Sequence, residues 1–150
     1  MFCWGTLPLV GYQQGGWSHL TYSLCHANVW HLAGNLFVLW VLPSVGWRRM
    51  VLAYFIAVLC SFGPFVPTVF DIVAGHPEAN NITVGFSGVL FAIIGIRWGA
   101  WSRKCVGKGW KLFLIRVMPI VMLGAFLPHI DWCLHLYCVL TGLAYGYSRG

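Results

Sequence analysis

The sequence is poor in charged residues and especially in acidic ones. Of its 150 residues only 8% are charged, and Asp and Glu together number 3 against 9 Lys and Arg. Hydrophobic residues make up 59% of the chain, so a soluble domain of this size would leave much apolar surface uncovered. The scarcity of charge therefore argues against an ordinary soluble domain and favours a protein that lies in a lipid bilayer.

Patterns typical of metal sites and disulfide frameworks are also missing. The 6 cysteines include no CxxC pair, and Cys60 and Cys138 fall within apolar segments. We therefore expect no metal site and read the cysteines as small packing residues. The formal net charge is +6, but the basic residues lie between or near the ends of apolar runs and form no single patch. We expect no nucleic-acid partner.

The chain does contain five apolar stretches, each able to cross a bilayer. They cover about residues 27–46, 50–70, 84–101, 112–128 and 132–148. One crossing takes about 20 residues, and backbone groups in lipid must be hydrogen-bonded within the protein, so these stretches are predicted to be helices. We expect an all-α fold, a polytopic transmembrane helical bundle. It forms a single domain over residues 1–150, in which residues 1–25 are a loop region on the outer side.

The basic residues predict how these helices are oriented. If the five stretches alternate, the loops richest in Lys and Arg fall on one side and the 3 acidic residues fall on the other. Positively charged loops stay in the cytoplasm, so the acidic side is predicted to face outward. The first stretch then begins outside, although nothing in residues 1–25 is long enough to bring the chain there. Either the N-terminus crosses by itself or a preceding helix is missing.

Three groups of polar residues lie near the predicted outer ends of the apolar stretches. They are His26, His31 and Asn35, then Ser87, then His135. A polar side chain at membrane depth is costly and commonly marks a pathway, a ligand or a chemical site. A single Ser is more often a packing residue, and a single His is more often a structural hydrogen-bonding group. Their shared depth and side favour one common site.

Small residues give two of these groups a reason to meet. Pairs of glycines four residues apart let membrane helices approach closely, and two such pairs follow the polar residues: Gly95 with Gly99, and Gly142 with Gly146. This approach would bring Ser87 within reach of His135, with Phe91 stacked on the imidazole. The alternative interpretation is a packing motif without chemistry.

Ser87 and His135 are the residue types that nucleophilic catalysis requires. A serine hydroxyl is a weak nucleophile until an adjacent base removes its proton, so we predict Ser87 as nucleophile and His135 as general base. The backbone N–H of Ser87 lies near a helix start and favours oxyanion charge, and His31 and Asn35 can add donors from another helix. No carboxylate is expected at this depth to orient His135, so a dyad is predicted.

These residues together resemble the rhomboid family of intramembrane serine proteases over about residues 15–147. The resemblance is carried by Trp17, the spacing of His26, His31 and Asn35, the segment Gly85-Phe86-Ser87-Gly88, and His135 with Gly142. It implies a serine endopeptidase that hydrolyses transmembrane protein substrates near the outer membrane face, without a metal or other cofactor. The corresponding location is the bacterial inner membrane, with the active site on the extracytoplasmic side.

The same resemblance implies roles for individual residues. It implies a Ser87/His135 dyad, oxyanion contacts from His31, Asn35 and the Ser87 N–H, and a position for His26 near the same cavity. The chain departs from the family pattern in three ways. Ser18 follows Trp17 where the family usually has arginine, Cys138 stands where a glycine is expected, and five crossings are predicted against six in the family core.

Two other functions are compatible with these residues. A rhomboid-like protein without catalytic activity would bind membrane clients without cutting them, although such relatives usually lose the Ser or the His that this chain keeps. A small transporter would use His26, His31 and His135 as a proton or metal relay, but it needs a water path to both faces. The sequence indicates neither the substrate nor the oligomeric state.

Overall fold

The computed structural model describes residues 17–26, 28–42, 45–64, 66–75, 85–105, 108–127 and 130–149. Within these ranges the chain is helical and forms no β-sheet, as the predicted all-α fold requires. The four longest helices are α2 (Val29–Val41), α3 (Trp47–Cys60), α5 (Ser87–Lys104) and α8 (Trp132–Arg149). Three shorter ones run on from one another: α6 (Gly109–Arg116), α7 (Met118–Leu123) and η2 (Gly124–Phe126). The others are α1 (Trp17–Thr21), η1 (Tyr22–Leu24) and α4 (Val69–Val73).

The stretch predicted as one helix over 50–70 is divided in the structure. Helix α3 begins earlier, at Trp47, and ends at Cys60. Pro64 and Pro67 follow, and a proline has no N–H to donate and keeps the preceding residue out of the helical conformation. The short α4 forms only after these two prolines, where the Thr68 side chain accepts a hydrogen bond from the Asp71 N–H.

Other predicted boundaries shift for similarly local reasons. The ranges 27–46, 84–101, 112–128 and 132–148 correspond to α2, α5, the α6–α7–η2 segment and α8. Helix α5 starts three residues later than predicted because Gly85 has a φ of 112°, which no helix accommodates. The α6–α7 boundary falls at Val117, just before the proline of the first turn of α7. Residues 17–24, predicted to be loop, form α1 and η1.

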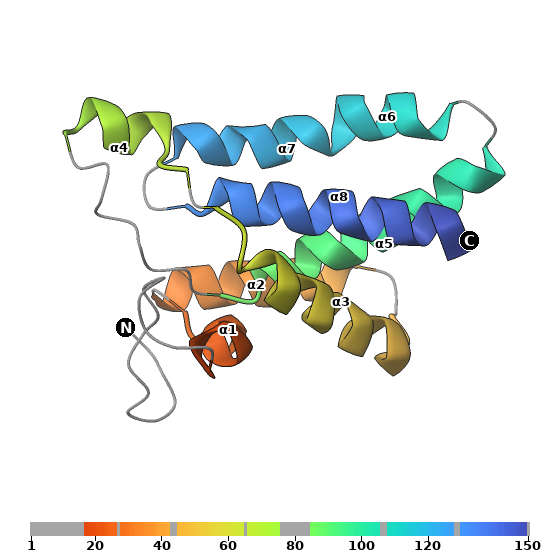
Figure 1. The fold of residues 1–150 in the computed structure, drawn as a ribbon, viewed down its shortest axis with the longest axis horizontal. Helices are drawn as coiled ribbons and strands as arrows, with labels where there is room; N and C mark the ends of the chain where they lie inside the picture. The colour runs from red at the N-terminus through yellow and green to blue at the C-terminus, as the bar shows by residue number, and fades with distance from the viewer. Residues whose placement is uncertain are drawn as a thin grey trace.

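Helices α5 and α8 form the most extensive contact in the described chain and lie at the centre of the bundle (Figure 1). Glycines allow this contact. A Cβ at Gly95 would lie 2.2 Å from the Val139 carbonyl oxygen, and one at Gly146 would lie 2.1 Å from the Ile96 carbonyl oxygen. Both obstacles are backbone atoms, which cannot rotate away as a side chain can. The close approach expected from the glycine pairs is therefore present.

The other helices pack on both sides of this pair. Helix α3 contributes Ala53, Ile56 and Ala57 to a core shared with α5 and α8. On the other side, Phe113, Val117 and Val121 of the α6–α7 segment pack against Val139 of α8. In Figure 1, α6 and α7 run along one side of α8, and α3 lies on the other. Helix α2 differs from these, because its contact with the bundle is limited to a few residues of α5.

The outer surface of the bundle is strongly apolar. Trp30 and Trp40 on α2 are 82% and 79% exposed, and large apolar side chains are also exposed on α3 and along α6 and α7. Within the described ranges, Gly109–Phe126 is the one helical segment that meets both the length and the hydropathy needed to cross a membrane, and α2 is a shorter apolar helix. The count of five crossings stays a prediction.

Candidate active site

The structure brings Ser87 and His135 into direct contact. Ser87 is the first residue of α5 and His135 lies in the first turn of α8, so the α5–α8 pair carries both. The Ser87 Oγ lies 2.8 Å from the His135 Nε2, a hydrogen-bonding distance. When the imidazole proton is on Nδ1, the Ser87 hydroxyl donates to Nε2, which is the arrangement that a general base needs.

Two neighbours hold the His135 ring in place. The ring centroids of Phe91 and His135 are 4.5 Å apart with planes inclined by 30°, so Phe91 lies against the imidazole one turn below Ser87. Asp131 fixes the start of α8, since its Oδ1 accepts a hydrogen bond of 3.0 Å from the Leu134 N–H. A carboxylate at this position also suits the positive end of the helix dipole. The orientation of His135 thus follows from packing and helix capping.

His31 and Asn35 of α2 gather over the backbone that precedes Ser87. A Cβ at Gly85 would lie 2.8 Å from the His31 Nε2 and 3.4 Å from the Asn35 Nδ2. Gly85 also has its positive φ, so two independent reasons require glycine there. Its N–H donates to the Tyr22 carbonyl oxygen at 3.0 Å, which ties this turn to η1. Donors from a second helix therefore lie beside the start of α5.

Helix α2 positions these donors through its first turn. The Asn28 side chain caps the helix by accepting a hydrogen bond of 2.8 Å from the His31 N–H. The His26 and His31 rings meet edge to face with centroids 5.4 Å apart. Burial lowers the pKa of His26, and the neighbouring His31 lowers it further, so His26 is neutral at pH 7.

Several buried polar atoms in this region have no partner in the described structure. They include the Asn35 Nδ2, the His26 Nε2 and the Ser23 Oγ. A buried polar group without a hydrogen bond carries a penalty of about 1–3 kcal/mol, so such atoms are suited to a ligand that satisfies them. All three residues line a cavity of about 310 Å³, whose remaining lining is Leu24, Leu32, Leu36, Leu39 and Phe86. The cavity is apolar with a few polar groups, as expected of a ligand site.

Tyr22 is a site neighbour that the sequence did not indicate. It is 1% exposed, and a Cβ at Gly88 would lie 3.0 Å from its hydroxyl oxygen. Burial raises the pKa of Tyr22, which keeps the hydroxyl neutral. Sequence reasoning missed it because residues 1–25 were expected to be loop. Cys138, which stands where the family pattern has a glycine, also packs here, 3.5 Å from the same Cβ position.

The remaining predicted site residues fall into two groups. Gly142 lies at the α5–α8 contact, where a Cβ would be 2.4 Å from the Ala92 carbonyl oxygen. The side chains of Trp17 and Ser18 lie outside what the structure describes. Within the described ranges no three His, Cys, Asp or Glu side chains are grouped as a metal site would require. The absence of a metal or cofactor from the reaction stays a prediction, as do the catalytic roles.

The fold and the site together define an all-helical bundle with a half-buried Ser–His pair at its central helix contact. A family model described as the Rhomboid domain matches residues 13–150, and the chain therefore belongs to the rhomboid family. The predicted family resemblance is thereby confirmed. The family consists of integral membrane proteins, generally serine proteases, and includes inactive members. No curated protein and no solved structure matches this chain.

Proposed function

We propose that this chain is an intramembrane serine protease in which Ser87 attacks the substrate and His135 acts as general base and then general acid. The observation that carries the proposal is the 2.8 Å contact between the Ser87 Oγ and the His135 Nε2 in a chain of the rhomboid family. A rhomboid-like protein without catalytic activity would not need this contact. Both residues sit on one rigid helix pair, which favours a constant reaction geometry.

Acylation follows from the protonation states of this pair. The Ser87 Oγ bonds to the scissile carbonyl carbon while its proton passes to the His135 Nε2, and the carbonyl oxygen takes the negative charge. The imidazolium then gives its proton to the leaving amide nitrogen as the C–N bond breaks. The products of this half-reaction are an ester on Ser87 and a free amine. Phe91 would keep the imidazole in line for both proton transfers.

The negative oxygen needs donors, and the start of α5 supplies one. Ser87 is the first residue of α5, and no side chain caps this helix end, so its N–H has no intrahelical acceptor. We propose that this N–H, the Asn35 Nδ2 and the His31 imidazole together bind the oxyanion. The buried, unpartnered Asn35 Nδ2 supports this role. A single donor of this kind is worth about 3 kcal/mol of transition-state stabilisation.

Deacylation restores the enzyme. A water molecule gives a proton to the His135 Nε2 and its oxygen attacks the ester carbon, after which the imidazolium returns a proton to the Ser87 Oγ as the acid product leaves. The proposed substrates are transmembrane segments cut near the outer membrane face. Segments with small or helix-destabilising residues are favoured, because an amide within an intact helix is shielded by its own hydrogen bonds.

Cleavage by the reconstituted chain tests the proposal. The protein is placed in liposomes with a labelled transmembrane substrate and compared with Ser87→Ala and with Ser148→Ala, a matched serine variant. Ser148 is exposed and its Oγ donates to the Tyr145 carbonyl oxygen of its own helix, far along α8 from His135. We expect cleavage by wild type and Ser148→Ala and none by Ser87→Ala. Equal product from wild type and Ser87→Ala would refute the proposal.

Covalent labelling separates catalysis from substrate choice. A fluorophosphonate probe reacts with an activated serine whatever the natural substrate is. We expect it to label wild type, and to label neither Ser87→Ala nor His135→Ala. A wild-type protein that binds transmembrane peptides but takes up no probe and cuts nothing would instead be the inert client-binding relative.

A further inference from the structure

Four arginines from three helices surround one cavity at the end of the bundle opposite the Ser–His pair. The cavity has a volume of about 270 Å³, and its charged lining residues are Arg48 and Arg49 from α3, Arg97 from α5 and Arg149 from α8. Its other lining residues are Leu52, Ile96, Ala100, Tyr145 and Gly146. None of these residues is acidic, so four like charges converge on one space.

The local electrostatics favour an anion in this cavity. Arg48 and Arg49 lie in the first turn of α3, at the positive end of its dipole, where acidic side chains are normally preferred. No acidic residue lies in that turn and no side chain caps it. Asp71 and Asp131, the acidic residues that the structure describes, belong to α4 and to the start of α8, whereas the cavity residues of α8 lie at its other end. A bound anion would offset this repulsion.

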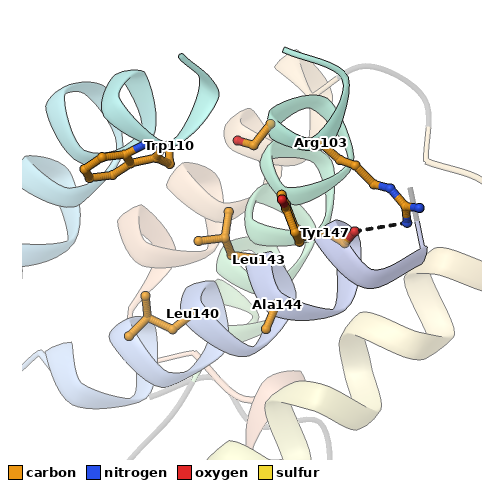
Figure 2. A pocket seen from close by; sticks show the side chains of 7 residues that line it. Arg103, Trp110, Leu140, Leu143, Ala144 and Tyr147 are labelled. Carbon is orange, nitrogen blue, oxygen red and sulfur yellow. Dashed lines mark hydrogen bonds between the residues drawn. The ribbon is translucent and has the colours of Figure 1, made fainter. Parts of the chain in front are cut away.

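A fifth arginine at the same end of the bundle, Arg103, has acceptors within the protein and serves as a comparison. The Arg103 Nη1 donates to the carbonyl oxygens of Tyr147 and Ser148 at 3.3 and 3.0 Å, and so caps the C-terminus of α8. Figure 2 shows this side chain reaching toward the end of α8, in a different pocket that it lines together with Trp110, Leu140 and Leu143. Arg103 has its acceptors in the protein, whereas the residues that line the four-arginine cavity include no acidic side chain.

We propose that the cavity binds the headgroup of an anionic phospholipid, with the guanidinium groups of Arg48, Arg49 and Arg149 around its phosphates. Each guanidinium group can bind two phosphate oxygens, and these three suit a headgroup with two phosphates, such as that of cardiolipin. Basic pockets between membrane helices are known to take such headgroups. Tyr145 offers a hydroxyl donor one turn deeper in the membrane.

The lining favours a lipid over a soluble anion. Leu52 lies one helical turn beyond Arg48 toward the bundle interior, and Ile96 and Ala100 flank Arg97. A lipid has a charged headgroup followed directly by apolar acyl chains. The arginines would contact the headgroup, and the apolar side chains next to them would contact the acyl chains. The part of the cavity wall formed by Gly146 and Ile96 is also rigid, because Gly146 brings the backbone of α8 into contact with the backbone of Ile96 on α5. This proposal does not rest on the proposed protease activity.

Native mass spectrometry of the detergent-solubilised protein with added cardiolipin or phosphatidylcholine tests the proposal. We compare Arg48→Gln/Arg149→Gln with Lys108→Gln/Lys111→Gln, which removes the same charge at the same end of the bundle but away from the cavity. Each basic residue near an anionic headgroup contributes about 1 kcal/mol, so the cavity variant should bind cardiolipin at least about tenfold more weakly. The lysine variant should bind it within about twofold of wild type.

Two further measurements complete the experiment: a variant that keeps the positive charge, and a soluble anion in place of the lipid. Arg48→Lys/Arg149→Lys should retain more cardiolipin than the glutamine variant, which shows that charge at these positions matters and that the loss is not misfolding. Equal loss by the cavity and lysine variants would overturn the proposal, since any cationic surface would then suffice. Inorganic pyrophosphate that binds more tightly than cardiolipin, with the same sensitivity to Arg48→Gln/Arg149→Gln, would overturn the lipid assignment in favour of a soluble anion.

Discussion

The α5–α8 pair and helix α2 both contribute to the candidate site, yet they are held in very different ways. The pair is locked by glycines, with backbone atoms where any Cβ at Gly95 or Gly146 would have to go. Helix α2 has Asn35 as its buried residue, and a Cβ at its Gly34 would meet nothing within 4 Å. The proposed nucleophile and base therefore lie on the most constrained part of the bundle, whereas the proposed α2 donors lie on the least constrained part.

This difference suggests how a small membrane protein can keep a precise Ser–His geometry and still admit a substrate helix. The proposed proton transfer between Ser87 and His135 tolerates little change in distance, so the two residues belong on a rigid contact. A substrate helix must enter between protein elements, and an element with few contacts is the one that can move at low free-energy cost. Variants in the pair should therefore alter stability or abolish chemistry, while variants in α2 should alter rate alone.

The largest expected effect comes from the base. His135→Ala removes the group that takes the Ser87 proton, and kcat should fall at least about 10³-fold, a loss typical of general acid–base catalysis. The unfolding midpoint in a detergent titration should change little, because the bundle keeps its glycine contacts. The combined Ser87→Ala/His135→Ala variant should be no slower than either single variant. Additive losses would show that the two residues do not act as one unit.

Overpacking the α5–α8 contact should come next. Gly95→Ala adds one methyl group 2.2 Å from the Val139 carbonyl oxygen, so the helices must separate. We expect a loss of about 1–3 kcal/mol in the free energy of unfolding, together with most of the activity. Gly34→Ala is the matched control, since its methyl group enters open space. Similar unfolding of both variants would contradict the idea that the pair is the rigid part of the site.

Loss of an α2 donor should lower the rate without lowering stability. Asn35→Ala removes the unpartnered Nδ2, and kcat should fall about 10²-fold, the usual effect of one oxyanion donor. KM and the unfolding midpoint should stay near their wild-type values. An increase in KM with unchanged kcat would instead place Asn35 in substrate binding.

The smallest effect is expected from the cap of α2. Asn28→Ala removes the acceptor for the His31 N–H and should destabilise the first turn by about 1 kcal/mol. We expect a severalfold decrease in kcat, because His31 is less well positioned, and no change in global unfolding. Asn28→Asp should restore the rate, since it keeps the acceptor. Hydrogen exchange of the α2 amides would detect the looser turn directly.

Much of the site could be predicted from the sequence because its signals are local. The glycine spacing of α5 and α8 indicated a close contact, and the polar residues at one predicted depth indicated which side chains would meet. Helix ends were less predictable. The division of 50–70 into α3 and α4 depends on two prolines whose effect the overall hydropathy hides. Tyr22 was missed because its burial results from η1 folding back onto α5, a contact between residues far apart in sequence.

The sequence by itself determined the membrane character of the chain, its helical class and the residue types available for chemistry, since hydropathy and glycine periodicity are properties of single segments. Only the tertiary structure decided that the Ser87 Oγ lies 2.8 Å from the His135 Nε2 and that His31 and Asn35 lie over Gly85. It also decided that arginines from three helices share one cavity. Each of these facts depends on how helices pack side by side, which no single segment encodes.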